Sequence, residues 1–167
     1  MVSALIRAAG QADAAGIAGI YNHYIANTAV TFEENAVAAA DIGERIQSAA
    51  RLDLPWLVAD ENGEIAGYAY ASKWNGRCAY RYSVEITVYL SPGRTHQGLG
   101  SMLYEALFAQ LRKQSVHVVI GGIALPNPAS IALHEKFGMK KVAHFEQVGF
   151  KFGQWVDVGY WQGILGD

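Results

Sequence analysis

Two spacings of hydrophobic residues recur along the chain, and together they predict both helices and strands. Apolar residues three and four apart predict a helix after Asp13, whose side chain suits a helix cap; one face carries Ile17, Ile20, Tyr21, Tyr24 and Ile25. Further helices are expected over residues 39–49 and 98–114, the latter with a stripe formed by Leu99, Leu103, Leu107 and Leu111. A fourth helix is expected between a cap at Asn127 and a closing glycine at Gly138.

Runs of β-branched and aromatic residues predict the strands. They cover residues 2–7, 55–59, 65–71, 80–90 and 116–123, with two more in 139–161 broken near Phe152 and Gly153. The turn ENGE makes the second and third strands a hairpin, and the unbroken apolar run at 116–123 predicts burial on both faces. Helices and strands alternate in the middle and strands dominate the ends. We therefore expect one domain over residues 1–167, an α/β or α+β layered fold with a mixed sheet.

Composition narrows the class of protein. The chain has 167 residues, of which 51% are hydrophobic and 17% charged, so it is not a disordered chain. The formal net charge of −2 provides no basic field for nucleic acid or an anionic membrane, and neither partner is expected. Cys78 is the single cysteine and cannot form an internal disulfide, which favours a reducing compartment. The first residues do not resemble a signal peptide and no apolar run reaches membrane-spanning length, so we expect a cytoplasmic protein.

A glycine-rich turn precedes the third helix. Gly98, Gly100 and Ser101 stand where a backbone can approach a ligand closely and where the first helical turn offers unpaired N–H groups. This is a candidate anion site suited to a pyrophosphate. It is neither a P-loop nor a dinucleotide fingerprint, because the lysine of the first and the third glycine of the second are missing. The plainer interpretation is that the glycines only permit a tight turn.

Glu85 is a carboxylate in the middle of the strongest predicted strand. Alternation places it on one strand face with Arg81, Ser83 and Thr87. A carboxylate there is either solvated, paired with Arg81, or retained for chemistry. If it is partly buried, its pKa is raised and it can act as a general base.

His134 lies one helical turn after Ser130 in the segment NPASIALHEKFGM. A lone histidine on a helix is more often structural than catalytic. The pair His134 and Glu135 matches the start of a zinc motif, but Gly138 stands where the second histidine is required. The other histidines show no metal-ligand spacing, so we expect no metal site.

In order and spacing, these segments resemble the GNAT superfamily of acetyl-coenzyme A-dependent N-acetyltransferases. The marks are the strand SVEITVYLSP, the turn HQGLGS, the strand VVIGGIA and the helix NPASIALHEKFGM. YNHYIANTAVTFE and YRYSVEITVY point further to the branch that acetylates phosphinothricin and methionine sulfoximine. The resemblance implies a GNAT-like mixed, mostly antiparallel twisted sheet flanked by helices, with acetyl-coenzyme A as co-substrate, and it suggests a homodimer.

The resemblance also implies a role for each matching position. Glu85 would deprotonate the amine, and His134, which stands where many members carry a tyrosine, would reprotonate the thiolate. The implied cofactor-binding residues are Val88, Tyr89, Leu90, His96, Gln97, Gly98, Leu99, Gly100, Ser101 and Asn127. One position departs from the family pattern, because Thr95 replaces the usual glutamine or arginine. Charge assistance to the pyrophosphate must then come from Arg94 or be absent.

The substrate class is expected from residues around the base. Arg81 would lie about 13 Å from Glu85, at about 3.3 Å per residue, which suits a small amino acid held between a base and an anion clamp. Phe32, Trp74 and Tyr80 would wall this pocket, although ordinary packing also explains such aromatics. We therefore expect acetylation of the α-amine of phosphinothricin, methionine sulfoximine or a similar amino acid. Acetylation of a polyamine or protein N-terminus, and non-catalytic sensing of acyl-coenzyme A, are the alternatives.

Overall fold

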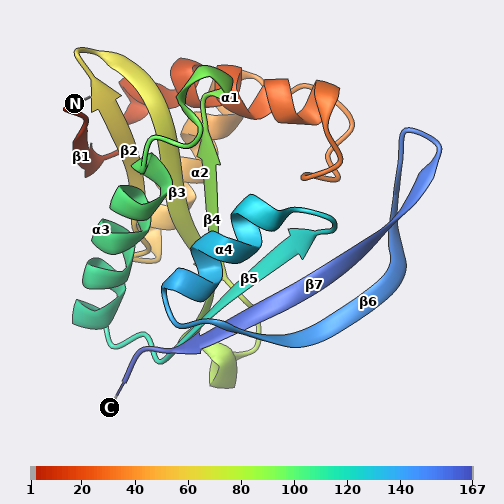
Figure 1. Cartoon of the computed structure of the whole chain (residues 1–167). Coiled ribbons are helices and arrows are strands. Elements are labelled where there is room, and N and C mark those ends of the chain that lie inside the picture. Colours follow the sequence, from red (N-terminus) through yellow and green to blue (C-terminus); the bar gives the residue numbers. More distant parts are fainter. Residues whose placement is uncertain (1–2, 167) are drawn as a thin grey trace.

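A single mixed sheet runs through residues 3–166, the part of the chain that the computed structural model describes (Figure 1). Its seven strands follow the order β1-β2-β3-β4-β5-β7-β6. Only β4 and β5 pair in parallel, and every other neighbouring pair is antiparallel. The strands are β1 (Leu5–Ala8), β2 (Trp56–Glu61), β3 (Glu64–Lys73), β4 (Ser83–Leu90), β5 (Val118–Ala124), β6 (Lys140–Lys151) and β7 (Gln154–Ile164).

Four α-helices cover the two faces of the sheet. Helices α1 (Ala14–Asn27) and α2 (Ala39–Arg51) pack on one face, in a core that includes Val58 and Tyr68. Helix α3 (Leu99–Lys113) buries its leucine stripe on the other face, where α4 (Pro128–Lys136) also packs through Leu133. The expected layered fold is confirmed. Each helix of residues 3–166 is too short or too polar to cross a membrane.

Local sequence signals placed most element boundaries within a few residues. Asn62 and Gly63 both have positive φ in the β2–β3 turn, as a tight hairpin requires. Asn127 caps α4 by accepting a hydrogen bond from the Ser130 N–H at 3.2 Å. Of the first predicted strand, Val2 lies outside the described residues.

Three expectations about the elements were wrong. Asp13 stands at the N-cap position of α1 but makes no side-chain cap bond, because its carboxylate accepts bonds from the Arg7 guanidinium and the Gly10 N–H. The central strand begins at Ser83 rather than at residue 80, because residues Cys78–Tyr80 form a 3₁₀ turn. Strand β5 is buried on one face only, and Gly122 on its other face is exposed.

Candidate active site

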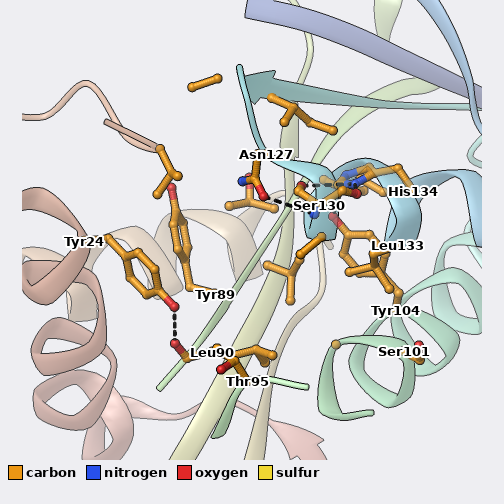
Figure 2. A pocket seen from close by; sticks show the side chains of 18 of the residues that line it. Tyr24, Tyr89, Leu90, Thr95, Ser101, Tyr104, Asn127, Ser130, Leu133 and His134 are labelled. Carbon is orange, nitrogen blue, oxygen red and sulfur yellow. Dashed lines mark hydrogen bonds between the residues drawn. The ribbon is translucent and has the colours of Figure 1, made fainter. Parts of the chain in front are cut away.

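The sheet splits between its two parallel strands. Strands β4 and β5 pair only over Ser83, Val84 and Glu85. Beyond Glu85 a cavity of about 440 Å³ opens, lined by residues 86–90 of β4 and by residues 122–124 of β5 (Figure 2). The β5-facing backbone edge of β4 is therefore free to pair with an extended ligand, as an added strand would.

The start of α3 closes one end of this cavity. Gly98 has φ +80°, a left-handed conformation that favours glycine, and directly precedes the helix. The first-turn N–H groups have no partners within the helix, and the dipole makes this end positive. Thr95, His96, Gly100 and Ser101 line the same wall. The arrangement suits a phosphate or pyrophosphate.

A basic side chain reaches this helix start from α4. Lys136 donates a hydrogen bond from Nζ to the Ser101 Oγ at 2.9 Å, and the pair is exposed. Arg94, the residue expected to assist the loop, instead forms an ion pair of 2.8 Å with Glu61. No sequence pattern points to Lys136, because it lies 35 residues from Ser101 along the chain.

Glu85 lies where the strands begin to separate. Its side chain lies on the same strand face as Thr87 and Tyr89, and this face is turned toward the α1–α2 core. Val84 and Ile86 lie on the opposite face, in the α3 core. Glu85 is half-buried, and burial raises the pKa of its carboxyl. Its Oε1 lies 3.6 Å from the ideal Cβ position of Gly122, an ordinary contact distance, so the carboxylate faces a β5 residue that lines the split. A half-buried carboxyl group with a raised pKa can act as a general base.

His134 is buried in the cavity wall with both ring nitrogens bonded. Its Nδ1 lies 2.7 Å from the Ser130 carbonyl oxygen, which can only accept, so Nδ1 carries the proton. Nε2, 3.0 Å from the Tyr104 hydroxyl, then accepts in the neutral ring. Burial lowers the pKa of His134, which favours that neutral form. The contacts hold the ring in one orientation beneath Gly121.

The structure brings most of the expected cofactor-binding residues together. The cavity is lined by Val88, Tyr89, Leu90, His96, Gly98, Gly100, Ser101 and Asn127. Leu99 instead lies in the core, and Gln97 is exposed. Sequence reasoning missed Tyr24, whose hydroxyl donates to the Leu90 carbonyl oxygen at 2.5 Å. Its position in the apolar stripe of α1 gave no sign that its hydroxyl reaches β4.

The expected substrate residues are more scattered. Because Arg81 precedes the strand, the predicted extended spacing to Glu85 is wrong; its guanidinium donates to the Cys78 carbonyl oxygen and lies over the Tyr82 ring. Tyr80 is exposed in the 3₁₀ turn.

The other two aromatics contact β7 and β6, the strands beyond β5. Trp74 packs edge-on against Tyr160, whose pKa is raised by burial and by the charge of Glu85. Phe32 lies against Gly149 of β6.

A second cavity, of about 580 Å³, lies on the α2 side of β3. Tyr70 and Ser72 line it, with Arg45 from α2. Ser72 stands directly opposite Glu85 in the β3–β4 register. Glu85 itself lines neither cavity; its chain neighbour Ile86 lines the first and its β3 neighbour Ser72 lines the second.

A seven-stranded sheet split at its one parallel pair, with an anion-binding helix start at the split, defines a class of acyl-coenzyme A-dependent transferases. The model of the acetyltransferase (GNAT) domain matches residues 6–159, so the chain belongs to the GNAT family and is an acetyl-coenzyme A-dependent N-acetyltransferase. In residues 3–166 no group of three His, Cys, Asp or Glu side chains could hold a metal ion.

Curated relatives and solved structures show which members of the family this chain is similar to. The chain is 41% identical to a phosphinothricin N-acetyltransferase of Streptomyces viridochromogenes, over 94% of this chain and 85% of the relative. It is 38% identical to an L-methionine sulfoximine/L-methionine sulfone acetyltransferase of Salmonella typhimurium, over 94% and 92%.

Among solved structures, a phosphinothricin acetyltransferase from Sinorhizobium meliloti in complex with acetyl-coenzyme A matches with TM-score 0.94 and 35% identity. That alignment covers 99% of this chain and 90% of the other. The expected family and co-substrate are confirmed.

Proposed function

We propose that this enzyme acetylates the α-amine of a small amino acid of the phosphinothricin or methionine sulfoximine type, with Glu85 as general base. The observation that carries the proposal is the half-buried Glu85, with its raised pKa, at the point where β4 and β5 separate. The names of the relatives support the substrate class.

The free backbone edge of residues 86–90 would pair with the pantetheine arm, and the N–H groups at the start of α3 would hold the pyrophosphate. Both features fit the co-substrate, because Gly98 leaves the helix start open and the cavity connects it to Glu85's end of the split. Acetyl-coenzyme A supplies an acetyl group activated as a thioester. Backbone N–H groups near Val88 would stabilise charge developing on the acyl oxygen.

Glu85 takes a proton from the substrate ammonium, directly or through water, so that a neutral amine can attack. The amine would approach Glu85 from the helical face, where Ser72, the β3 neighbour of Glu85, lines the second cavity. Trp74 and Phe32 would flank the substrate from β3 and from the α1–α2 segment. The Arg81 guanidinium donates to the Cys78 carbonyl oxygen within its own turn. Arg81 would bind the carboxylate of the substrate only after this hydrogen bond breaks and the side chain reorients.

We assign His134 to positioning rather than to direct proton donation. Its Nδ1 proton is bound by the Ser130 carbonyl and its pKa is lowered, so an imidazolium is disfavoured at neutral pH. The leaving thiolate would then take its proton from solvent.

We propose further that the enzyme is a cytoplasmic homodimer. An exposed thiol at Cys78 is typical of a reducing compartment. The β6–β7 hairpin carries large exposed hydrophobic side chains, namely Val142, Phe145, Val148, Phe150, Phe152 and Trp155. β6 is also an edge strand. A second copy covering this surface would remove both features from water.

The experiment is release of coenzyme A from acetyl-coenzyme A over an amine panel. The panel contains L-phosphinothricin, L-methionine sulfoximine, spermidine and a peptide with a free N-terminus. We expect the highest kcat/KM with the two amino-acid analogues. Higher values with spermidine or the peptide would move the enzyme to another substrate class, and absence of turnover with every amine would favour a sensor of acyl-coenzyme A.

A further inference from the structure

A buried glutamate ends strand β2. Glu61 is 8% exposed, and its Oε2 pairs with Arg94 Nη2 at 2.8 Å. The other oxygen, Oε1, is buried and has no hydrogen-bond partner in residues 3–166. A buried carboxylate with one unpaired oxygen gains little stability from such an ion pair. We therefore look for the role of the Glu61–Arg94 pair in the segment that it holds in place.

The pair holds the loop that leads to the proposed pyrophosphate site. Arg94 ends the 3₁₀ turn Pro92–Arg94, and the next two residues, Thr95 and His96, line the cavity. The ends of β2 and β4 lie at the same end of the sheet, and the loop runs from there to α3 (Figure 1).

The backbone of this loop needs support. His96 has φ +63°, a left-handed conformation that is unfavourable for a residue other than glycine. On the C-terminal side the loop is fixed by α3. On the N-terminal side the Ser91 N–H bonds the Ala66 carbonyl, and the side chain of Arg94 adds the ion pair with Glu61.

We propose that Glu61 and Arg94 are positioning residues that latch the phosphate-binding loop, and that Arg94 does not itself bind the phosphates. The proposal rests on the proposed cofactor site. Glu61 offsets the charge of Arg94, whereas Lys136 places an ammonium directly at Ser101 of the helix start. In this arrangement Arg94 supplies geometry and Lys136 supplies charge.

Glu61→Gln distinguishes a positioning role of Arg94 from a direct phosphate contact, because the two roles predict opposite changes in the KM for acetyl-coenzyme A. A neutral amide holds Arg94 less firmly, because charge-assisted bonds are about twice as strong as neutral ones. We expect the KM for acetyl-coenzyme A to rise about tenfold, with kcat and the amine KM little changed. If Arg94 were a phosphate ligand restrained by Glu61, the same change would free its charge and lower the KM, which would overturn the proposal.

A second acetyl donor shows whether the effect lies at the phosphate loop. S-acetylpantetheine lacks the pyrophosphate, so Glu61→Gln should leave its kcat/KM unchanged. Equal losses with both donors would show a general structural role and overturn the latch. If the wild-type enzyme itself shows no preference for acetyl-coenzyme A over S-acetylpantetheine, the proposed cofactor site fails, and the latch fails with it.

Two further variants complete the test. Arg94→Ala combined with Glu61→Gln should raise the KM no more than Arg94→Ala alone, because both changes act on the same interaction. Arg94→Ala alone leaves the buried Glu61 carboxylate unpaired, whereas the double variant leaves no unpaired buried charge. We therefore expect the double variant to fold even if Arg94→Ala does not, and its Tm measures this. Glu64→Gln removes an exposed charge from the same hairpin and should change neither KM. Additive increases in the double variant would contradict the latch.

Discussion

At the scale of single residues, the sequence identified Glu85 and its strand face but not its surroundings. Alternation along β4 was sufficient to separate Glu85 from Val84 and Ile86. The expected pairing of Glu85 with Arg81 failed because the strand begins at Ser83, three residues later than predicted, after the 3₁₀ turn at Cys78–Tyr80. His134 was found by its motif position, and its bond to Ser130 one helical turn earlier is local to α4, but its bond to Tyr104 depends on the packing of α4 against α3, which no local pattern shows.

Lys136 provides a prediction at this scale. We expect Lys136→Met to raise the KM for acetyl-coenzyme A about three- to tenfold, because an exposed charge beside a phosphate site is screened and worth about 1 kcal/mol. The effect should shrink as ionic strength increases. Lys140→Met, another exposed lysine just beyond α4, is the control. Steady-state kinetics at low and high salt measure both, and equal KM values for Lys136→Met and the wild type at low salt would remove this charge from the site.

At the scale of elements, glycine and cap signals predicted the turn into α3 and the start of α4. The split between β4 and β5 was not predictable from either strand alone, because both continue as regular strands beyond the last paired residues. On its other edge β5 stays paired with β7 along its whole length, so the two strands diverge from β4 together. The apolar run at β5 therefore indicated two buried faces, whereas one face opens beside Glu85 and Tyr160.

Gly98 tests the role of the helix start. Gly98→Ala adds a Cβ at φ +80°, where the added atom meets no neighbour but the backbone conformation is strained. We expect the first turn of α3 to shift and the KM for acetyl-coenzyme A to rise more than the amine KM. Gly63→Ala, at φ +92° in the β2–β3 turn, carries similar strain and serves as the control. Isothermal titration with coenzyme A measures the cofactor side directly, and unchanged affinity in a folded Gly98→Ala protein would place the pyrophosphate elsewhere.

At the scale of the whole molecule, the layered fold followed from the order of elements, but the shape of the last hairpin did not. Strands β6 and β7 extend past the body of the protein (Figure 1). Phe32 packs against Gly149, and the buried Lys151 donates to the Thr31 carbonyl oxygen at 2.8 Å, so the hairpin is fixed to the α1–α2 segment. Alternation predicted two strands there, yet it gave no information on the partner for their exposed side chains.

The proposed dimer gives a prediction at this scale. Val148→Asp and Phe152→Asp place charges in the exposed hydrophobic surface of the hairpin, and we expect each to shift the protein from dimer to monomer. Leu5→Asp, at an equally exposed hydrophobic residue on β1, is the matched control and should leave the dimer intact. Sedimentation velocity distinguishes the species. A wild-type protein that sediments as a monomer throughout the micromolar range contradicts the dimer.

The most direct test of the account is the pH dependence of kcat/KM for the wild type and Glu85→Gln, with L-phosphinothricin as amine. Because burial raises the pKa of Glu85, the wild-type rate should fall as pH decreases through that raised value, above the ordinary range of a carboxyl group. Glutamine cannot accept the proton, so kcat should fall roughly 10²–10⁴-fold near pH 7, and the loss should shrink at high pH where more amine is neutral. Affinity for acetyl-coenzyme A should stay the same. A Glu85→Gln enzyme within a few-fold of wild type at every pH would contradict the assignment of Glu85 as the base.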